Sequence, residues 1–411
     1  MKIALIQETK HPVDNRVALT PEQMAMLQRD YPNDRFVVQS SNLRAYNDDQ
    51  YRAAGIPVVE DVADCDVLMG IKEVKLDCLL PHKHYFFFGH FAKMQAYNRP
   101  LVKTLMERKI TFTDYEYLVD EKGQRVCAFG WWAGVVGVYY TLRGYGLRHH
   151  LYELPPADRT FTLEGIVRLL KNTPLPHIKL VVTGAGRVSQ GAQHLLREIG
   201  ALHIDEETFL QDKAVETLAY CVADVDRLVK RTDGGAFSWD DFTRHPQEYH
   251  SDFMRWGRAA DALLCAHFWA PDAPVYLSEA DLADSTLRIR MIGDVTCDIR
   301  GSVKSTLRAS THDAPYYDYN PATQEEEPAF SSPSNITVMA VDTCPNALAL
   351  DSSAYFGDAL LPHVLRPLLN RTGSPIIDGA TILREGKLTP KFDYLKNWAI
   401  YSKPETLDLI S

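Results

Sequence analysis

Residues 179–192 read KLVVTGAGRVSQGA, and this stretch decides the fold. The apolar run Lys179–Thr183 predicts a buried strand, and the helical spacing of the apolar residues after the glycines predicts a helix that continues to Ile199. Gly184 and Gly186 form the turn between them, where glycine lets the backbone approach a pyrophosphate at the helix N-terminus. The stretch predicts a dinucleotide-binding loop, with a glycine turn in an ordinary α/β core as the alternative.

Two further residues bear on the choice of dinucleotide. Asp205 follows Gly184 by 21 positions, and at a strand end it would bind the ribose hydroxyls and repel a 2′-phosphate, which favours NAD. Arg187 lies inside the loop and would instead pair with a 2′-phosphate, so NAD and NADP both stay open. Ser189 stands where the third glycine of the pattern usually lies. The expected cofactor-binding residues here are Gly184, Gly186, Arg187, Val188, Ser189 and Asp205.

Short apolar runs alternate with helical spacing on both sides of the loop. The expected strands are Ile3–Ile6, Phe36–Gln39, Val67–Ile71, Tyr85–Phe88 and Ile110–Thr113 before it, and 289–294 and 335–341 after it. This alternation predicts mostly parallel sheets covered by helices. Thr20 and Pro21 predict a helix start, because both residue types are favoured there. The irregular, aromatic and basic stretch Asp224–Ala270 is interpreted as an insertion.

A chain of 411 residues is long enough for two domains. We expect an α/β fold of two Rossmann-like doubly wound domains with a cleft between them. Residues 1–150, completed by residues 351–411, are expected to form the substrate and catalytic domain. Residues 151–350 are expected to bind the dinucleotide. The glycine-rich run Trp131–Leu147 predicts a helix that connects the two domains and packs through its small residues.

Composition limits the classes of partner. A net charge of −10 and a pI near 5.8 argue against binding to nucleic acid or to an anionic membrane. The N-terminal MKIALIQETK is too short for a signal peptide, and no apolar stretch is long enough to span a bilayer. The seven cysteines are dispersed and fit buried thiols in a reducing compartment. We expect a cytoplasmic protein with small-molecule partners and no metal; a homo-oligomer stays open.

Charged residues follow the predicted strands of the first domain. Lys10 and Arg16 come after the first strand, and Lys72 and Glu73 come after the third. Ligands of open α/β sheets bind at the carboxyl ends of strands, and Lys and Arg there suit a carboxylate substrate. His90 ends an aromatic run and would transfer protons near neutral pH, since its unperturbed pKa is about 6.5. The alternatives are exposed basic loops and a structural histidine.

Two aspartates follow the predicted strand 289–294. Asp294 ends the strand, where a solvated carboxylate is the alternative to a functional one. Asp298 lies in the following turn and is the better candidate, because there it could orient a histidine or hold a cationic state.

Seven motifs match one known family in order. They are ETKHPVDNRVALTP, GIKEVK, FFFGHFAKMQ, DYEYLVDEKGQRVCAFGWWAGVVG, TGAGRVSQGAQ, GDVTCDIRGS and MAVDTCPNALALDSSAYFGDALLPHV, and they extend over nearly the whole chain. The chain resembles the alanine dehydrogenase and lysine-forming saccharopine dehydrogenase superfamily. Within it, the chain is most similar to the lysine–2-oxoglutarate reductase domain of bifunctional aminoadipic semialdehyde synthase. The stretches Arg125–Gly130 and 240–249 carry this closer resemblance.

The resemblance implies roles for individual residues. Lys10 and Arg16 match the family's substrate-carboxylate binders, and Lys72 and His90 match its acid–base pair. Glu116 matches a pocket carboxylate. The other positions expected from the motifs are Asp298 beside the nicotinamide, Glu73, Arg125 and Phe129 in the substrate site, and Asp342 and Pro345 in the cofactor site.

The resemblance also implies an activity, that of an NAD(P)H-dependent oxidoreductase acting on CH–NH bonds. The expected reaction reduces the imine of lysine and 2-oxoglutarate to saccharopine, or runs in reverse. The relatives that the resemblance indicates prefer NADP, which tips the expectation toward NADP. Two other functions stay open: an alanine dehydrogenase-like enzyme that uses a small 2-oxo acid and ammonia, and a non-catalytic dinucleotide sensor.

Overall fold

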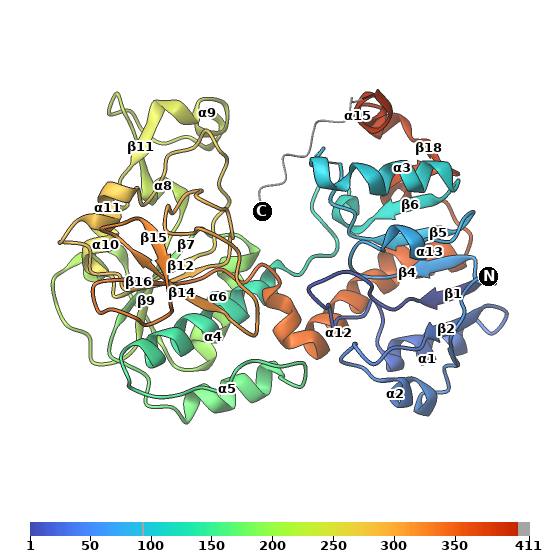
Figure 1. Cartoon of the computed structure of the whole chain (residues 1–411), viewed down its shortest axis with the longest axis horizontal. Helices are drawn as coiled ribbons and strands as arrows, with labels where there is room; N and C mark the ends of the chain where they lie inside the picture. Colours follow the sequence, from blue (N-terminus) through green and yellow to red (C-terminus); the bar gives the residue numbers. More distant parts are fainter. Residues whose placement is uncertain (93, 402–411) are drawn as a thin grey trace. The chain divides into compact units, whose positions relative to one another are not determined.

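The computed structural model describes residues 1–92 and 94–401 and divides the chain into two compact units. Unit 1 comprises residues 1–128 and 349–411, and unit 2 comprises residues 129–348. Each is an α/β structure built on a mainly parallel eight-stranded sheet, so the predicted fold class is confirmed (Figure 1). In the described part of the chain, no helix is both long and apolar enough to cross a membrane.

The sheet of unit 1 has the strand order β18-β17-β6-β5-β4-β1-β2-β3. The strands from β6 to β3 in this order are parallel to their neighbours, whereas β17 and β18 are antiparallel. All five predicted strands of this unit are present, with ends shifted by at most two residues. The strands are β1 (Lys2–Leu5), β2 (Arg35–Gln39), β3 (Val58–Val59), β4 (Val67–Met69), β5 (His84–Phe87), β6 (Thr111–Asp114), β17 (Thr381–Arg384) and β18 (Lys387–Leu388).

The helices of unit 1 come from both ends of the chain. They are α1 (Pro21–Asp30), α2 (Asp48–Ala53), α3 (Arg99–Glu107), α12 (Ala349–Leu360), α13 (Arg366–Leu369), α14 (Pro375–Ala380) and α15 (Leu395–Tyr401). The predicted start of α1 is confirmed: the Thr20 hydroxyl accepts from the Gln23 backbone N–H, and the Gln23 side chain accepts from Thr20. β17 pairs with β6 and α15 packs on α3, so the C-terminal segment completes the unit of the N-terminal segment (Figure 1).

The sheet of unit 2 has the strand order β15-β14-β16-β13-β12-β7-β9-β8. Its strands are β7 (Lys179–Thr183), β8 (Leu202–His203), β9 (Ala219–Ala223), β12 (Ala262–Cys265), β13 (Met291–Asp294), β14 (Tyr316–Asn320), β15 (Glu325–Glu327) and β16 (Ile336–Met339). The helices are α4 (Gly130–Arg148), α5 (Leu163–Lys171), α6 (Arg187–Glu198), α7 (Glu206–Leu210), α8 (Val225–Leu228), α9 (Trp239–Arg244), α10 (Met254–Ala259) and α11 (Glu279–Ala283). The glycine loop joins β7 to α6, as predicted.

The interpretation of Asp224–Ala270 as one insertion is wrong in part. β12 lies inside this stretch and is a central strand between β7 and β13. Its four apolar residues are too few to show a period, so the sequence did not distinguish it from a loop. Residues 229–251 form a separate part of this stretch, which we call the insertion. They contain the two-stranded sheet of β10 (Val229–Arg231) and β11 (Tyr249–Ser251) and the helix α9 (Figure 1).

The predicted helix after residue 130 is present as α4, and it packs within unit 2. A Cβ on Gly134 would lie 1.8 Å from the Val188 carbonyl oxygen, and a Cβ on Gly191 would lie 1.8 Å from the Trp131 carbonyl oxygen. Glycine at both positions therefore lets the backbones of α4 and α6 touch. For this reason the units divide at residues 128 and 129, whereas the sequence interpretation placed the domain boundary at residue 150.

Candidate active site

Two predicted catalytic residues of unit 1 and three predicted substrate-binding residues follow four adjacent parallel strands. In the sheet order β6-β5-β4-β1, each strand ends at the same edge, and a candidate side chain follows each one. Lys10 follows β1, Lys72 and Glu73 follow β4, His90 follows β5, and Glu116 follows β6. The sheet thus gathers residues that are 106 positions apart in the sequence at the edge where α/β folds bind ligands.

Glu73 connects two of these residues. Its carboxylate accepts a hydrogen bond from Lys10 Nζ at 2.6 Å and another from His90 Nδ1 at 2.8 Å. Burial by itself would raise the pKa of Glu73, but the bonds and charges of His90 and Lys10 outweigh it and lower the pKa to about 2. Because Nδ1 donates to a carboxylate, a neutral His90 ring carries its acceptor lone pair on Nε2.

Lys72 is held in place through its backbone. The Glu8 carboxylate accepts from the backbone N–H of Ile71 at 2.6 Å and of Lys72 at 2.9 Å, which ties the loop after β4 to the loop after β1. Burial, and then the neighbouring charge of Arg16, lower the pKa of the Lys72 ammonium. Within the described residues, no hydrogen bond or ion pair engages Lys72 Nζ. An amine with a lowered pKa and no fixed partner is suited to proton transfer.

Sequence reasoning assigned no role to Glu8 or to Asp14. The Asp14 carboxylate accepts from Arg16 Nε at 2.9 Å and also binds Nη2, and both side chains are at most 5% exposed. Arg16, the predicted substrate anchor, is therefore a partner in a buried ion pair. The D-x-R spacing was visible in the sequence, but its meaning depends on burial.

Glu116 and Arg125 form an ion pair beside the end of β6, with 3.1 Å between Arg125 Nη2 and Glu116 Oε1. Asp114, the last residue of β6, accepts from the backbone N–H of Gly89 and of Glu116 and so fixes the loops that carry His90 and Glu116. Burial raises the pKa of Asp114 to about 7. The structure thus brings Glu116 and Arg125, which were predicted separately, together as an ion pair, and it adds Asp114 as a residue that positions the loop of Glu116.

Phe129 lies apart from that group in the chain. It is buried at the N-cap of α4, in unit 2.

The glycine loop of unit 2 has the geometry of a phosphate-binding turn. Gly184 has φ +80°, and a Cβ there would lie 2.7 Å from the Cα of His267, so only glycine fits. Gly186 has open space where a Cβ would lie, directly before the first turn of α6. Arg187 and Val188 begin that helix, and Ser189 is fully buried. The open side of Gly186 fits the close approach of a pyrophosphate to the helix N-terminus.

Asp205 follows a strand, as expected, but this strand is β8 and is not the neighbour of β7. β8 lies at the edge of the sheet, and β9 lies beside β7. Asp205 is exposed and caps α7, where its carboxylate accepts from the Thr208 backbone N–H at 2.8 Å. The acidic residue that follows the strand next to β7 is Asp224. Sequence spacing alone did not distinguish the two aspartates, because each of them follows a short strand after the glycine loop.

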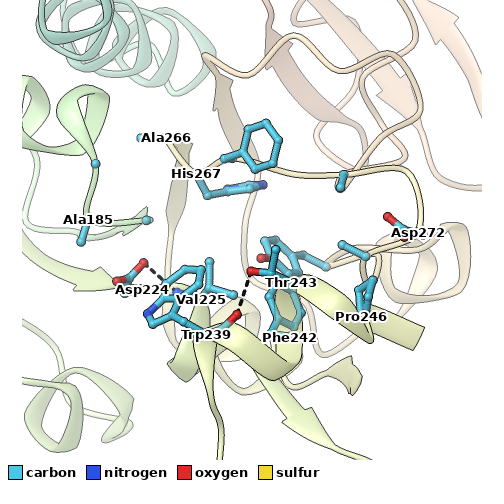
Figure 2. A pocket seen from close by; sticks show the side chains of 16 residues that line it. Ala185, Asp224, Val225, Trp239, Phe242, Thr243, Pro246, Ala266, His267 and Asp272 are labelled. Carbon is cyan, nitrogen blue, oxygen red and sulfur yellow. Dashed lines mark hydrogen bonds between the residues drawn. The ribbon is translucent and has the colours of Figure 1, made fainter. Parts of the chain in front are cut away.

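A cavity of about 440 Å³ lies beside the glycine turn (Figure 2). Its walls come from the glycine turn, from the start of α8, from the insertion and from the loop after β12. The lining residues are Gly184, Ala185, Gly186, Asp224, Val225, Trp239, Phe242, Thr243, Pro246, Ala266, His267, Phe268, Ala270, Asp272, Ala273 and Tyr276. This size and mostly apolar lining are typical of small-molecule sites.

The remaining predicted residues lie after β13 and β16. Asp298 lies in the turn after β13, next to Cys297, whose φ is +54°, and burial raises the pKa of Asp298. Asp342 is exposed in the turn after β16, and Pro345 is buried in the short helix that follows. These turns lie at the same edge of the sheet as the glycine loop, because β7, β13 and β16 run parallel.

Comparisons with known proteins found a matching family model and several homologues. A family model described as "Alanine dehydrogenase/PNT, N-terminal domain" matches residues 4–136. The alpha-aminoadipic semialdehyde synthase of Arabidopsis thaliana is 28% identical over 452 aligned positions, which cover 99% of this chain and 42% of the relative. This chain thus spans less than half the length of the semialdehyde synthases it matches.

A shorter relative and a solved structure match along most of their length. The saccharopine dehydrogenase (NAD(+), L-lysine-forming) of Emericella nidulans is 26% identical, with 89% of this chain and 92% of the relative covered. A solved L-alanine dehydrogenase has 16% identity and a TM-score of 0.66, with 97% of this chain and 100% of that chain covered, which shows a shared fold. The chain therefore contains an alanine dehydrogenase/PNT N-terminal domain and is homologous to the aminoadipic semialdehyde synthases and the lysine-forming saccharopine dehydrogenases.

Proposed function

We propose that this protein is a lysine–2-oxoglutarate reductase, which reduces the imine of lysine and 2-oxoglutarate with a nicotinamide dinucleotide or oxidises saccharopine in the reverse direction. The observation that carries the proposal is the group at the sheet edge of unit 1. There, Lys72 has a lowered pKa, and His90 is held by Glu73, which also binds Lys10. The names of the homologues support the same reaction.

The chain's own residues would perform the proton transfers. Formation of an imine requires a proton on the carbinolamine oxygen and the loss of one from nitrogen. Lys72 and His90 Nε2 supply a donor and an acceptor for these steps, and Glu73 keeps the His90 ring in one tautomer. Lys10, Arg16 and Arg125 supply positive charge for substrate carboxylates.

The residues present fit a dinucleotide. The open space at Gly186 and the N-terminus of α6 suit the pyrophosphate, and Asp224 suits ribose hydroxyls. When bound, the nicotinamide supplies or accepts the hydride. Asp298, Asp342 and Pro345 remain the residues proposed to lie near the cofactor.

The test of the reaction is a comparison of substrate pairs with the purified protein. We expect kcat/KM for lysine with 2-oxoglutarate to exceed that for ammonia with pyruvate, as measured by dinucleotide oxidation. The second candidate is an alanine dehydrogenase-like enzyme, which the matched N-terminal domain model favours. Faster turnover of pyruvate with ammonia would select that candidate. A protein that binds dinucleotide but turns over neither pair would be a sensor.

The position of Asp224 leads us to propose NAD as the cofactor, in place of the NADP that the sequence resemblance favoured. A carboxylate at the end of β9 binds ribose hydroxyls and repels a 2′-phosphate. Replacing Asp224 with Ala should raise the kcat/KM ratio of NADPH to NADH by about 10–150-fold, since a charge-assisted hydrogen bond contributes roughly 1.5–3 kcal/mol.

The matched control for this prediction is Asp205→Ala, which removes an exposed carboxylate that caps α7. It should leave the NADPH to NADH ratio unchanged. Arg187→Ala should raise KM for both dinucleotides equally if Arg187 serves the pyrophosphate. An enzyme that prefers NADPH before any substitution, or that gains NADPH use only through Asp205→Ala, would contradict the assignment.

A further inference from the structure

The insertion of unit 2, residues 229–251, is a small module with its own internal bonds. Arg231 of β10 pairs with Asp233 at 2.8 Å, with Glu248 at 3.1 Å and with Asp241. The Tyr249 hydroxyl of β11 donates to the same Asp241 carboxylate at 2.7 Å. These contacts join the two-stranded sheet of β10 and β11 to α9, so the position of the helix is fixed.

Aromatic rings of the insertion pack against one another around α9. Phe242 packs edge-to-face on Tyr249, with 5.1 Å between ring centroids, and Phe237 packs edge-to-face on Trp239 at 5.3 Å. Despite these contacts, 53% of Trp239 is exposed. The indole is therefore fixed on one side and open on the other, and it lines the cavity beside the glycine turn (Figure 2).

The type of residue that lines the cavity changes from one end of it to the other. Asp224 and Ala185 lie at one end, next to the glycine turn, and Asp272 and Pro246 lie at the other (Figure 2). Trp239, Phe242 and Val225 form one wall, and His267 lies across from them. Phe268, another lining residue, is 87% exposed, so a second large ring also presents its surface to an incoming ligand. The glycine turn, a carboxylate and large aromatic rings therefore line the same cavity.

We propose that the insertion 229–251 is the adenine-binding wall of the dinucleotide site, with Trp239 as the stacking surface. This inference rests on the proposed use of a nicotinamide dinucleotide. A flat ring system that stacks on an indole gains contact without needing specific hydrogen bonds, so the wall accepts a purine through its face. The ion pairs of Arg231 position this wall. The wall comes from the insertion and not from the strands of the Rossmann-like sheet.

The experiment measures binding of fragments to the whole protein by titration calorimetry. The probes are ADP-ribose and AMP, which carry the adenine, and nicotinamide mononucleotide, which lacks it. Trp239→Ala should weaken ADP-ribose and AMP by about 5–150-fold, the range for a lost base–aromatic stack. Trp239→Phe should restore most of the affinity. The control Arg244→Ala alters an exposed residue on the same helix, paired with Asp240, and should bind as the wild type does.

Two further measurements distinguish a role of Trp239 in adenine binding from a role in folding alone. The melting temperature of Trp239→Ala should match that of Arg244→Ala, and in turnover the variant should raise KM for the dinucleotide while kcat at saturation stays unchanged. Equal affinity of Trp239→Ala and wild type for ADP-ribose would overturn the inference, as would tighter binding of nicotinamide mononucleotide than of AMP to this wall.

Failure of the inference and failure of the proposed function give different results. If the protein binds ADP-ribose through Trp239 but reduces no lysine–2-oxoglutarate imine, the adenine wall stands and the proposed reaction fails. If the protein performs the reaction while Trp239→Ala binds ADP-ribose normally, only the adenine wall is wrong.

Discussion

Replacing Lys72 with Met is expected to lower kcat by about 10²–10⁴-fold, the usual effect of losing a general acid or base. The melting temperature should barely change, because no hydrogen bond or ion pair within the described residues depends on Lys72 Nζ. Met keeps the length and much of the volume of the buried stem but has no ionisable group. The measurement is steady-state turnover with lysine and 2-oxoglutarate, alongside thermal unfolding.

The pH dependence of turnover gives a second reading of the same residue. Burial and Arg16 lower the pKa of Lys72, so its titration in the wild type should appear below the ordinary lysine value of 10.5. If that group limits kcat, the limb of the pH profile at alkaline pH should be present in the wild type and absent in Lys72→Met. His90→Gln should also lower kcat by about 10²–10⁴-fold and should leave the Lys72 limb in place.

The matched control is Lys75→Met, which removes the charge of an exposed lysine three residues further along the same loop. It should keep wild-type turnover. Near-normal turnover by Lys72→Met together with a large fall in melting temperature would assign Lys72 to folding and contradict its role in proton transfer.

Much of unit 1 was predictable from the sequence, because its parallel strands are bounded by clear changes in pattern. Apolar runs such as Tyr85–Phe88 end in charged or polar residues, and parallel strands deliver those residues to one edge. The prediction that Lys72 and His90 each follow a strand needed only this pattern, and the structure shows that the two strands are neighbours. Their roles in proton transfer stay predictions.

The order of the strands in unit 2 could not be predicted from the pattern of apolar residues. Asp205 and Asp224 both follow short strands after the glycine loop, and only the pairing of β9 with β7 distinguishes them. Strand pairing is a contact between distant residues, so local spacing carries no record of it. β12 was missed for a related reason: four apolar residues are compatible with a strand, a loop or a helix segment.

Buried carboxylates were the other omission. Glu8, Asp14 and Asp114 lie close in sequence to the predicted residues. The role of each depends on the hydrogen bonds that its carboxylate accepts in the folded protein. Glu8 binds backbone amides of the loop after β4, and Asp114 binds amides of the loops after β5 and β6. Such residues position catalytic groups without showing a motif of their own.

Replacing Arg16 with Ala is expected to destabilise the protein by about 3–5 kcal/mol, the usual cost of breaking a buried ion pair by removing one partner. Arg16 and Asp14 are 5% and 2% exposed, so the Asp14 carboxylate would be left in a place from which water is largely excluded. Urea denaturation of the two proteins at neutral pH measures the difference in the free energy of unfolding.

The pH dependence of this loss has a definite sign. Burial is the largest influence on the pKa of Asp14 and raises it, and in the wild type Arg16 outweighs burial so that the pKa is lowered. Without Arg16, we expect the pKa in the folded state to rise above that in the unfolded state. Asp14 then favours folding while it is protonated, and this contribution is lost as pH rises through the folded pKa. The variant should therefore be closest to wild type at acid pH and furthest from it above neutrality.

The double variant Asp14→Asn with Arg16→Met separates stability from substrate binding. Removing both charges should restore most of the stability, since a buried pair replaced by neutral groups is often nearly as stable. If Arg16 also anchors the keto acid, the double variant should still bind 2-oxoglutarate more weakly by about 1.5–3 kcal/mol, read as a rise in KM with dinucleotide binding unchanged. A double variant with full stability and unchanged KM would leave Arg16 with a purely structural role, and an Arg16→Ala protein as stable as wild type would refute the buried pair itself.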